Sequence, residues 1–246
     1  MRARTFVLLL GLITAHPILA SDPCGLGYDY TRPENWGNLR PEWTQCNTGS
    51  VQSPIYVNGP NDNDLPLISV SYGQGLVKIN NTGHTLKVYP KFPATLTRGN
   101  FTATLEEFHF HVPVEHKTNT NQNARAELHL LYEFPNEEQA VLAVMIEEGP
   151  RNPALEVLLV DPPAACQSVE PTRSVNLAQL IPGALNRYFT YIGSLTTPPC
   201  KEGVLWFVLD DSIKASDDQI RQLSNGNNSR TLQQPWAHQV RRRQVP

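Results

Sequence analysis

The amino-acid sequence predicts a mainly β protein with one large, twisted and mostly antiparallel central sheet and short peripheral helices. Apolar and β-branched residues recur in short runs separated by turn residues, which is typical of strands. The 21 prolines among 246 residues, with few long apolar periodic stretches, argue against a helical bundle. No internal repeat or low-complexity linker divides residues 21–246, so we expect a single domain there.

The expected strands follow one another along the chain. Residues 76–89 give two extended runs, broken at the Asn-Thr-Gly of 81–83. Three runs rich in β-branched, aromatic and leucine residues come next, and a continuous apolar run, typical of a strand buried on both faces, comes last. These four runs are 103–112, 126–134, 139–147 and 203–209.

Two short helices are expected between and after these runs. Asn152 can cap a helix over 152–160, with Pro153 in its first turn. Ser216 can open a second helix over 216–223, because Gln219 follows at the spacing of a capping box.

Residues 1–20 have the pattern of an export signal. Arg2 and Arg4 form a basic start, residues 6–13 are apolar, and residues 18–20 (ILA) resemble a small-residue cleavage site. A membrane anchor is the alternative, but a span needs about 20 apolar residues. We therefore expect a secreted protein, or one in another oxidising compartment, without membrane attachment once the signal is removed.

The charge composition excludes some partners. The chain has 20 Lys and Arg against 23 Asp and Glu, a net charge of -3, whereas a nucleic-acid-binding protein normally shows a basic excess. The run Arg241–Arg243 is short and is expected to be a solvated end of the chain. Charged residues at 17% and apolar residues at 40% also argue against a disordered tail.

Export makes the cysteines candidates for disulfide bonds. None forms a C-x-x-C pair, which disfavours a zinc ribbon, and their spacing leaves all three pairings open. The four cysteines are Cys24, Cys46, Cys166 and Cys200. The three candidate glycosylation sites, each the first residue of an Asn-x-Ser/Thr sequon, are Asn80, Asn100 and Asn227.

Four of the seven histidines lie between residues 109 and 129. His109 and His111 are two apart on an expected strand, so their side chains lie on the same face. His129 lies on the next strand, and hairpin-like pairing would bring it beside them. Three converging imidazoles suit a tetrahedral metal whose fourth position stays open for water. Because neither cysteine nor carboxylate is among the ligands, Zn²⁺ is the leading candidate.

Carboxylates accompany two of these histidines. Glu107 and Glu127 each lie two residues before a histidine, on the same strand face, where they can accept the outer N–H of a ligating imidazole. The alternative for the H-x-H pattern alone is an exposed strand face. The added E-x-H pattern and the matching apolar alternation favour a metal site.

A second cluster, Ser194–Cys200 (SLTTPPC), precedes the last apolar run. The two prolines would hold its threonines in a rigid loop, where a hydroxyl could orient a metal-bound hydroxide. Taken alone, an ordinary Ser/Thr turn is the better interpretation of this segment.

Together these motifs resemble the alpha-class carbonic anhydrases. The shared motifs, in the family's order, are PENW at 33–36, QSPI at 52–55, NTGH at 81–84, FHFH at 108–111, EH at 115–116, ELH at 127–129 and SLTTPP at 194–199. They cover nearly all of the chain beyond the expected signal. The stretch 33–43 and the variant HVPVEH at 111–116 are most similar to the plant, algal and bacterial branch, which includes the dioscorins.

The resemblance implies a lyase, carbonate dehydratase, that hydrates CO2 reversibly to bicarbonate and a proton through a zinc-bound hydroxide. His109, His111 and His129 would be the zinc ligands. Thr196 would donate to Glu115 and accept from the hydroxide, which orients it. The implied partners are CO2, bicarbonate, small anions and sulfonamide inhibitors, and a monomer and a homodimer both remain open.

Further roles follow from the same resemblance. His84 matches the proton-shuttle position, where an imidazole can relay a proton to buffer. His116 and Tyr191 match positions that support the site by hydrogen bonding. The residues that match the substrate and anion side or the apolar wall are Thr197, Leu131, Val141, Leu195, Val204 and Trp206.

The chain departs from the family pattern near the expected metal. Glu107 stands where the family usually has Gln, and its charge is expected to raise the pKa of zinc-bound water. Lys87 replaces the usual Gln or Asn and is expected to alter anion and inhibitor affinity. The resemblance further implies a Cys46–Cys200 disulfide beside the loop that carries Thr196, and with it a Cys24–Cys166 disulfide.

Two other classes of protein compete with an enzyme. A storage or binding protein on the same fold, as some dioscorins are, would not need the complete set of ligands, threonine, Glu115 and shuttle. A matrix protein that binds mineral ions would show long acidic or Gly-Asn repeats, and the sequence has none.

Overall fold

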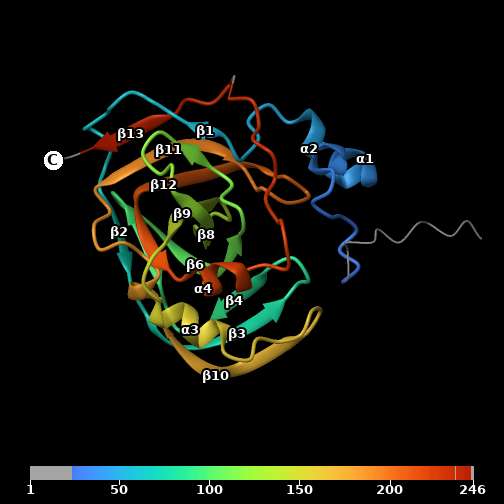
Figure 1. The fold of residues 1–246 in the computed structure, drawn as a ribbon. Helices are drawn as coiled ribbons and strands as arrows, with labels where there is room; N and C mark the ends of the chain where they lie inside the picture. Colours follow the sequence, from blue (N-terminus) through green and yellow to red (C-terminus); the bar gives the residue numbers. More distant parts are fainter. Residues whose placement is uncertain (1–23, 236, 245–246) are drawn as a thin grey trace, which may run out of the picture.

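The computed structural model describes residues 24–244 except residue 236 (Figure 1). The expected signal peptide, residues 1–20, lies outside the described residues. Within the described part of the chain, no helix is long and apolar enough to span a bilayer.

The main element is an 11-stranded sheet in the order β10-β3-β4-β6-β8-β9-β12-β11-β13, with β5 paired to β6 and to the outer strand β2. The pairs are antiparallel except for β9 with β12, which confirms a mostly antiparallel sheet. Its strands are β2 Ile68–Ser71, β3 Gln74–Asn81, β4 Leu86–Pro90, β5 Thr95–Arg98, β6 Phe101–His111, β8 Ala124–Glu133, β9 Gln139–Glu148, β10 Ser168–Asn176, β11 Arg187–Ser194, β12 Glu202–Ala215 and β13 Arg241–Gln244. A small separate sheet pairs β1 Tyr56–Val57 with β7 Lys117–Thr118.

Short helices lie at the periphery of the sheet (Figure 1). The α-helices are α1 Trp36–Leu39, α2 Gln45–Thr48, α3 Pro153–Leu159 and α4 Asp217–Gln222, and 3-10 turns cover Pro33–Asn35, Pro41–Trp43 and Leu177–Gln179. The two predicted helix starts are confirmed. Asn152 accepts from the N–H groups of Ala154 and Leu155, and Ser216 with Gln219 forms a capping box.

Strand alternation divides the apolar residues between two cores on the two faces of the sheet. Phe108 and Phe110 of β6 are fully buried in the larger core. Trp206 and Val208 of β12 belong to the smaller core on the opposite face. The histidines of β6 and β8 share the face of the smaller core, so the expected site has an apolar floor.

The expectation that the C-terminal arginines are a solvated end of the chain is wrong in part, because Arg241 is exposed but the segment is a strand and Arg242 is largely buried. Arg241–Gln244 is β13, which pairs with β11. Arg242 donates to Asp210 Oδ2 at 2.9 Å and lies over the ring of Phe189. A hydropathy pattern cannot reveal this strand, because its side chains are charged and its pairing with β11 is made by the backbone.

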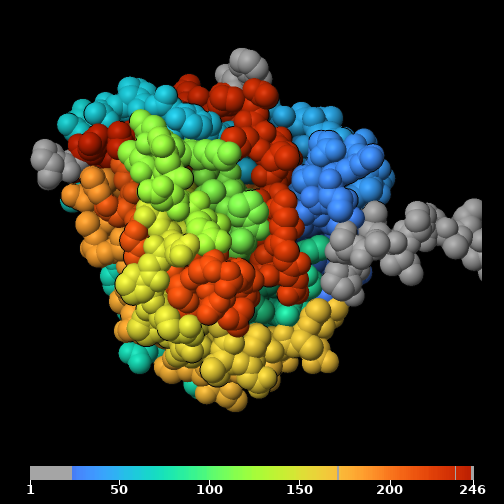
Figure 2. All heavy atoms as spheres, in the orientation of Figure 1, coloured from blue at the N-terminus to red at the C-terminus, as the bar shows by residue number. Residues whose placement is uncertain are grey.

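Two disulfides, Cys46–Cys200 and Cys24–Cys166, tie the N-terminal segment to loops beside the sheet. The first joins α2 to the loop after β11. Figure 2 shows the segment after α4, in red, lying against the N-terminal segment, in blue. Arg230 makes this contact, since its guanidinium donates to the carbonyl of Cys46 at 2.8 Å.

Candidate functional site

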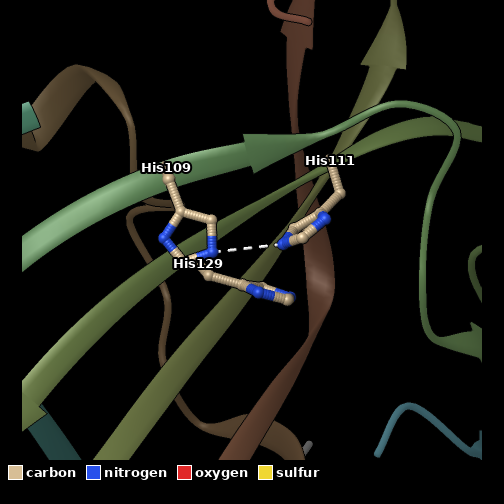
Figure 3. A group of neighbouring side chains, drawn as sticks. All are labelled: His109, His111 and His129. Carbon is tan, nitrogen blue, oxygen red and sulfur yellow. Dashed lines mark hydrogen bonds between the residues drawn. The ribbon is translucent and has the colours of Figure 1, made fainter. Parts of the chain in front are cut away.

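Three histidine side chains converge from two neighbouring strands (Figure 3). His109 and His111 lie on β6, and His129 lies directly opposite His109 on β8. One ring nitrogen from each lies within 4.8 Å of the others, as a metal ion requires. Opposite residues in an antiparallel ladder share a face, so the strand register itself brings the rings together.

The hydrogen bonds at the back of each ring fix its tautomer. His109 Nδ1–H donates to Glu107 Oε1 at 3.0 Å, and His111 Nδ1–H donates to the carbonyl of Asn228 at 2.8 Å. Both Nε2 atoms therefore carry lone pairs, yet they face each other at 3.1 Å. His129 Nε2–H donates to Glu127 Oε1 at 2.8 Å, which leaves its Nδ1 as the free nitrogen.

This arrangement fits a metal ion. Two lone pairs at 3.1 Å with no proton between them repel each other unless a cation lies close to both. Neutral imidazole is the form in which histidine binds metal, and three imidazoles with an open fourth position are typical of catalytic zinc. This set of three nitrogen donors therefore suits Zn²⁺.

Burial keeps the three imidazoles neutral. It lowers the pKa of His111 to about 4 and that of His129 to about 3, and it lowers the pKa of His109. At neutral pH all three rings can therefore offer a lone pair without first losing a proton.

Glu127 is the centre of a buried hydrogen-bond network. Its Oε1 accepts from His129 and, at 2.6 Å, from His116 Nδ1–H, and its Oε2 accepts from the backbone N–H of Glu115 and His116. The nearby imidazoles hold its pKa well below the usual value although burial opposes this. His116, Glu127 and His129 also lie close enough to hold a metal, but their facing atoms already bond to one another.

The network continues away from the three converging histidines. His116 Nε2 and the Tyr191 hydroxyl are 2.6 Å apart, and the same hydroxyl lies 2.9 Å from Ser53 Oγ. Gly193 makes this approach possible, because an added Cβ would lie 2.2 Å from Ser53 Oγ. The structure thus joins His116 and Tyr191 to the site through Glu127.

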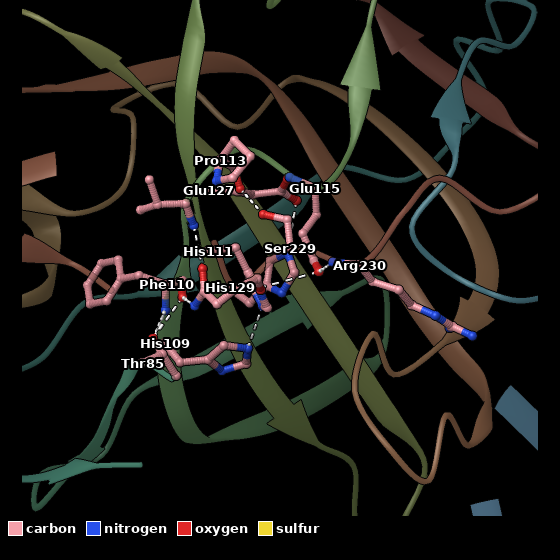
Figure 4. Close-up of polar contacts among 12 residues, drawn as sticks. Thr85, His109, Phe110, His111, Pro113, Glu115, Glu127, His129, Ser229 and Arg230 are labelled. Carbon is pink, nitrogen blue, oxygen red and sulfur yellow. Dashed lines mark hydrogen bonds and ion pairs between the residues drawn. The ribbon is translucent and has the colours of Figure 1, made fainter. Parts of the chain in front are cut away.

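Glu115 lies behind the site on the loop after β6 (Figure 4). Its Oε1 accepts from the backbone N–H of Arg230 at 2.7 Å, while its Oε2 has no hydrogen-bond partner among the described residues. Burial raises the pKa of Glu115 to about 8, and the neighbouring charge of Glu127 adds to the rise. The hydrogen bond from the backbone N–H of Arg230 and the nearby Thr196 hydroxyl oppose this rise.

The loop between β11 and β12 closes the site from the front. Backbone bonds from Leu195 to Lys201 and from Cys200 to Thr197 hold it, at 2.9 and 2.8 Å. A cavity of about 80 Å³ lies beneath the loop. Its lining residues are Lys87, Glu107, His109, His129, Leu131, Val141, Leu195, Thr196, Thr197 and Trp206.

The expected wall residue Val204 and the expected proton shuttle His84 lie outside this lining. Val204 is buried in the smaller core behind the cavity wall. His84 is also buried, with its ring packed on Tyr28 and Tyr30 at centroid distances of 5.2 Å. Its Nε2–H donates to the carbonyl of Tyr28 at 3.2 Å, so its Nδ1 is the nitrogen that can accept a proton.

Several contributors to the site carry no sequence signal. Asn228 orients His111, and Arg230 bonds Glu115 through its backbone while its guanidinium reaches Gln52 and Ser53. The bond to Glu115 comes from a backbone N–H, which every residue type except proline offers. Lys87 Nζ lies 3.4 Å from Glu107 Oε1, so the two departures from the family pattern form an ion pair.

Comparisons with known proteins agree on one family. The model of the eukaryotic-type carbonic anhydrase family matches residues 31–245. A carbonic anhydrase of Pectobacterium carotovorum is 37% identical over 84% of this chain and 84% of its own, and dioscorin DB3S of Dioscorea polystachya is 31% identical over 82% and 79%. The alpha-carbonic anhydrase of Thermovibrio ammonificans, solved with the inhibitor sulfanilamide, superposes with a TM-score of 0.80 at 32% identity and covers 87% of this chain and 96% of its own.

The metal-free protein should lose stability as the pH falls below about 6.5. An unfolded histidine titrates near about 6.5, whereas His111 and His129 titrate at about 4 and about 3 in the fold. The unfolded chain therefore binds protons first, and each such group lowers the free energy of unfolding by up to about 1.4 kcal/mol per pH unit down to its folded pKa. Urea unfolding of metal-free protein from pH 7.5 to 4.5 measures this slope.

The matched control is the double variant His111→Gln/His129→Gln, which should show a shallower pH slope because two of the titrating groups are gone. Equal slopes in the two proteins would contradict the buried, neutral imidazoles.

Proposed function

Because the chain belongs to the eukaryotic-type (alpha) carbonic anhydrase family, we propose that it is a zinc enzyme that hydrates CO2 reversibly to bicarbonate and a proton. The observation that carries the proposal is the set of three buried imidazoles whose free nitrogens converge. His109, His111 and His129 would hold the metal. Zinc held there would supply Lewis-acid chemistry, lowering the pKa of a bound water so that a nucleophile forms near neutral pH, as is known for this family.

The hydrogen bonds behind the ligands have a role in this proposal. Glu107, Glu127 and the carbonyl of Asn228 each accept from one ligand ring, which fixes the tautomer and the ring orientation. No ring has to rotate or lose a proton when the metal binds. The three rings would therefore have the orientation and protonation that the metal needs before it binds.

Thr196 and Glu115 would orient the reacting group. Thr196 lines the cavity, and Glu115 lies behind it with Oε2 unpartnered among the described residues. A nearby cation favours the ionised carboxylate, which can only accept a hydrogen bond. The Thr196 hydroxyl would then donate to Glu115, and its oxygen would remain as an acceptor facing the cavity.

The rest of the cavity suits an uncharged substrate. Leu131, Val141, Leu195 and Trp206 give it an apolar wall, which can receive CO2 without binding it strongly. Thr197 adds a hydroxyl on the same side, where it can contact bicarbonate. Small anions and sulfonamide inhibitors are further expected ligands, since the related enzyme from Thermovibrio ammonificans was solved with sulfanilamide.

His84 would carry the proton away from the site. Its Nε2–H is held by the carbonyl of Tyr28, so a proton would enter at Nδ1 and leave after the ring turns or exchanges its partner. The packing against Tyr28 and Tyr30 would set the resting orientation of the ring.

Secretion is part of the proposal. It rests on the signal-like residues 1–20 and on two disulfides, which form in oxidising compartments. The sequon residues Asn100 and Asn227 are exposed, as glycosylation requires, whereas Asn80 lies within β3 and is partly buried. Complete ligands and a built cavity favour catalysis over the storage role open to dioscorin-like proteins.

The zinc-loaded protein should contain one zinc per chain and hydrate CO2 in a stopped-flow assay, and acetazolamide should inhibit it. Thr196→Ala should keep the zinc and lower kcat/KM by about a hundredfold, because the hydroxyl positions the reacting group. Thr196→Ser is the matched control that retains a hydroxyl. Protein refolded with zinc that neither binds the metal nor hydrates CO2 would overturn the proposal.

His84→Ala should slow CO2 hydration in weakly buffered solution, and added imidazole should restore the rate by carrying the proton in its place. Initial rates at low and high buffer concentration measure the effect, with zinc content as the check on folding. Turnover that is unchanged in weak buffer would remove His84 from the mechanism.

Glu107→Gln should lower the midpoint of the pH–rate profile, because a negative charge next to His109 opposes loss of a proton from the metal centre. Lys87→Gln should move the midpoint upward, since Lys87 offsets the charge of Glu107. The shift for Lys87 should be the smaller one, because its side chain is 37% exposed and water screens it.

The double variant Glu107→Gln/Lys87→Gln separates the two effects and should return toward the wild-type midpoint. A midpoint that stays fixed in Glu107→Gln would contradict the expected effect of this carboxylate.

A further inference from the structure

A cavity of about 330 Å³ lies beside β11, apart from the histidine site. β13 pairs with β11 only at residues 187–190, so the edge of β11 at Tyr191 and Ile192 has no strand partner on that side within the described chain. The cavity lies at this unpaired edge, where Tyr191 and Ile192 line it. Its lining residues are Val51, Arg98, Thr190, Tyr191, Ile192, Leu205, Ala237, Gln239 and Arg241.

Two arginines give the cavity a positive wall. Arg98 ends β5, and its guanidinium forms no ion pair with any residue that the structure describes; its Nε is buried without a partner. Arg241 lies directly opposite Thr190 in the β11–β13 ladder, so their side chains share one sheet face. Arg241 uses one N–H on Asp62, at 3.2 Å, and keeps its other donors.

Thr190 is an independent sign that a ligand belongs here. The residue is 4% exposed, and its hydroxyl is buried with no hydrogen-bond partner in the described part of the protein. A buried hydroxyl without a partner costs free energy, so native proteins normally satisfy it. Thr190 lines the cavity together with Arg98 and Arg241.

We propose that this cavity binds a small oxyanion, with Arg98, Arg241 and the Thr190 hydroxyl donating to its oxygens. Guanidinium groups bind carboxylate and phosphate oxygens with charge-assisted hydrogen bonds, and a threonine hydroxyl completes such a set. Ile192 and Leu205 add apolar surface beside the charged groups, and the volume exceeds that of an inorganic ion. The oxyanion can therefore be the carboxylate of a small organic acid as well as an inorganic anion.

The test is thermal unfolding of the zinc-loaded protein in phosphate, bicarbonate or butyrate at constant ionic strength. Wild type should be stabilised in a saturable way, as expected when a ligand binds only the folded state. Thr190→Val and Arg98→Met should each weaken the apparent affinity at least tenfold. Arg151→Met, which removes an exposed arginine outside the cavity, should respond as wild type.

Anion binding at the metal would stabilise all four proteins equally, so only the difference between them reports this cavity. If butyrate raises the melting temperature more than phosphate does, the ligand of this cavity is an organic acid. If phosphate raises it more, the ligand is an inorganic anion. Without anion, Thr190→Val should melt at or above the wild-type temperature, because it loses no internal hydrogen bond. Equal anion responses in all four proteins, or a marked drop in the melting temperature of anion-free Thr190→Val, would overturn the proposal.

Discussion

The pairing of β6 with β8 holds the whole site in place. His109 faces His129 and His111 faces Glu127 across this ladder, so the three converging imidazoles and one carboxylate share a face through register alone. A slip of one residue would turn His129 into the larger core and bring Leu128 or Leu130 to the site, because strand side chains alternate. Leu128 and Leu130, which are fully buried in the larger core, oppose such a slip, since it would turn them out of that core.

A buried carboxylate then fixes the protonation and orientation of the histidines beside it. Glu127 accepts four hydrogen bonds in a dry environment, and those bonds hold His129 and His116 in one tautomer. Arg230 links the same region to the N-terminal segment, since its backbone contacts Glu115 while its guanidinium contacts Cys46 and Gln52. The Cys46–Cys200 disulfide joins that segment to the loop that carries Thr196. The cavity is therefore closed by segments that are distant in sequence.

Period-two spacing predicted the central strands and the faces of His109, His111 and His129, because alternation is a local property of a strand. The helix caps at Asn152 and Ser216 could be predicted for the same reason, because capping also depends on residues close in sequence. Asn228 was not, since it acts on His111 through a backbone carbonyl 117 residues away, and neither its type nor its spacing indicates that contact. The sequence also did not predict β13 or the unpartnered hydroxyl of Thr190. A charged edge strand and an unsatisfied hydroxyl can be recognised only once the pairing of distant strands is known.

The central claim is that three neutral imidazoles form a zinc cage, and X-ray absorption at the zinc edge tests it most directly. Purified protein as isolated should show three nitrogen ligands from histidine at about 2.0–2.1 Å and one further light ligand. His84→Ala should give the same spectrum, since His84 lies outside the cage. A sulfur ligand near about 2.3 Å, or a shell of six oxygens without imidazole scattering, would contradict the account.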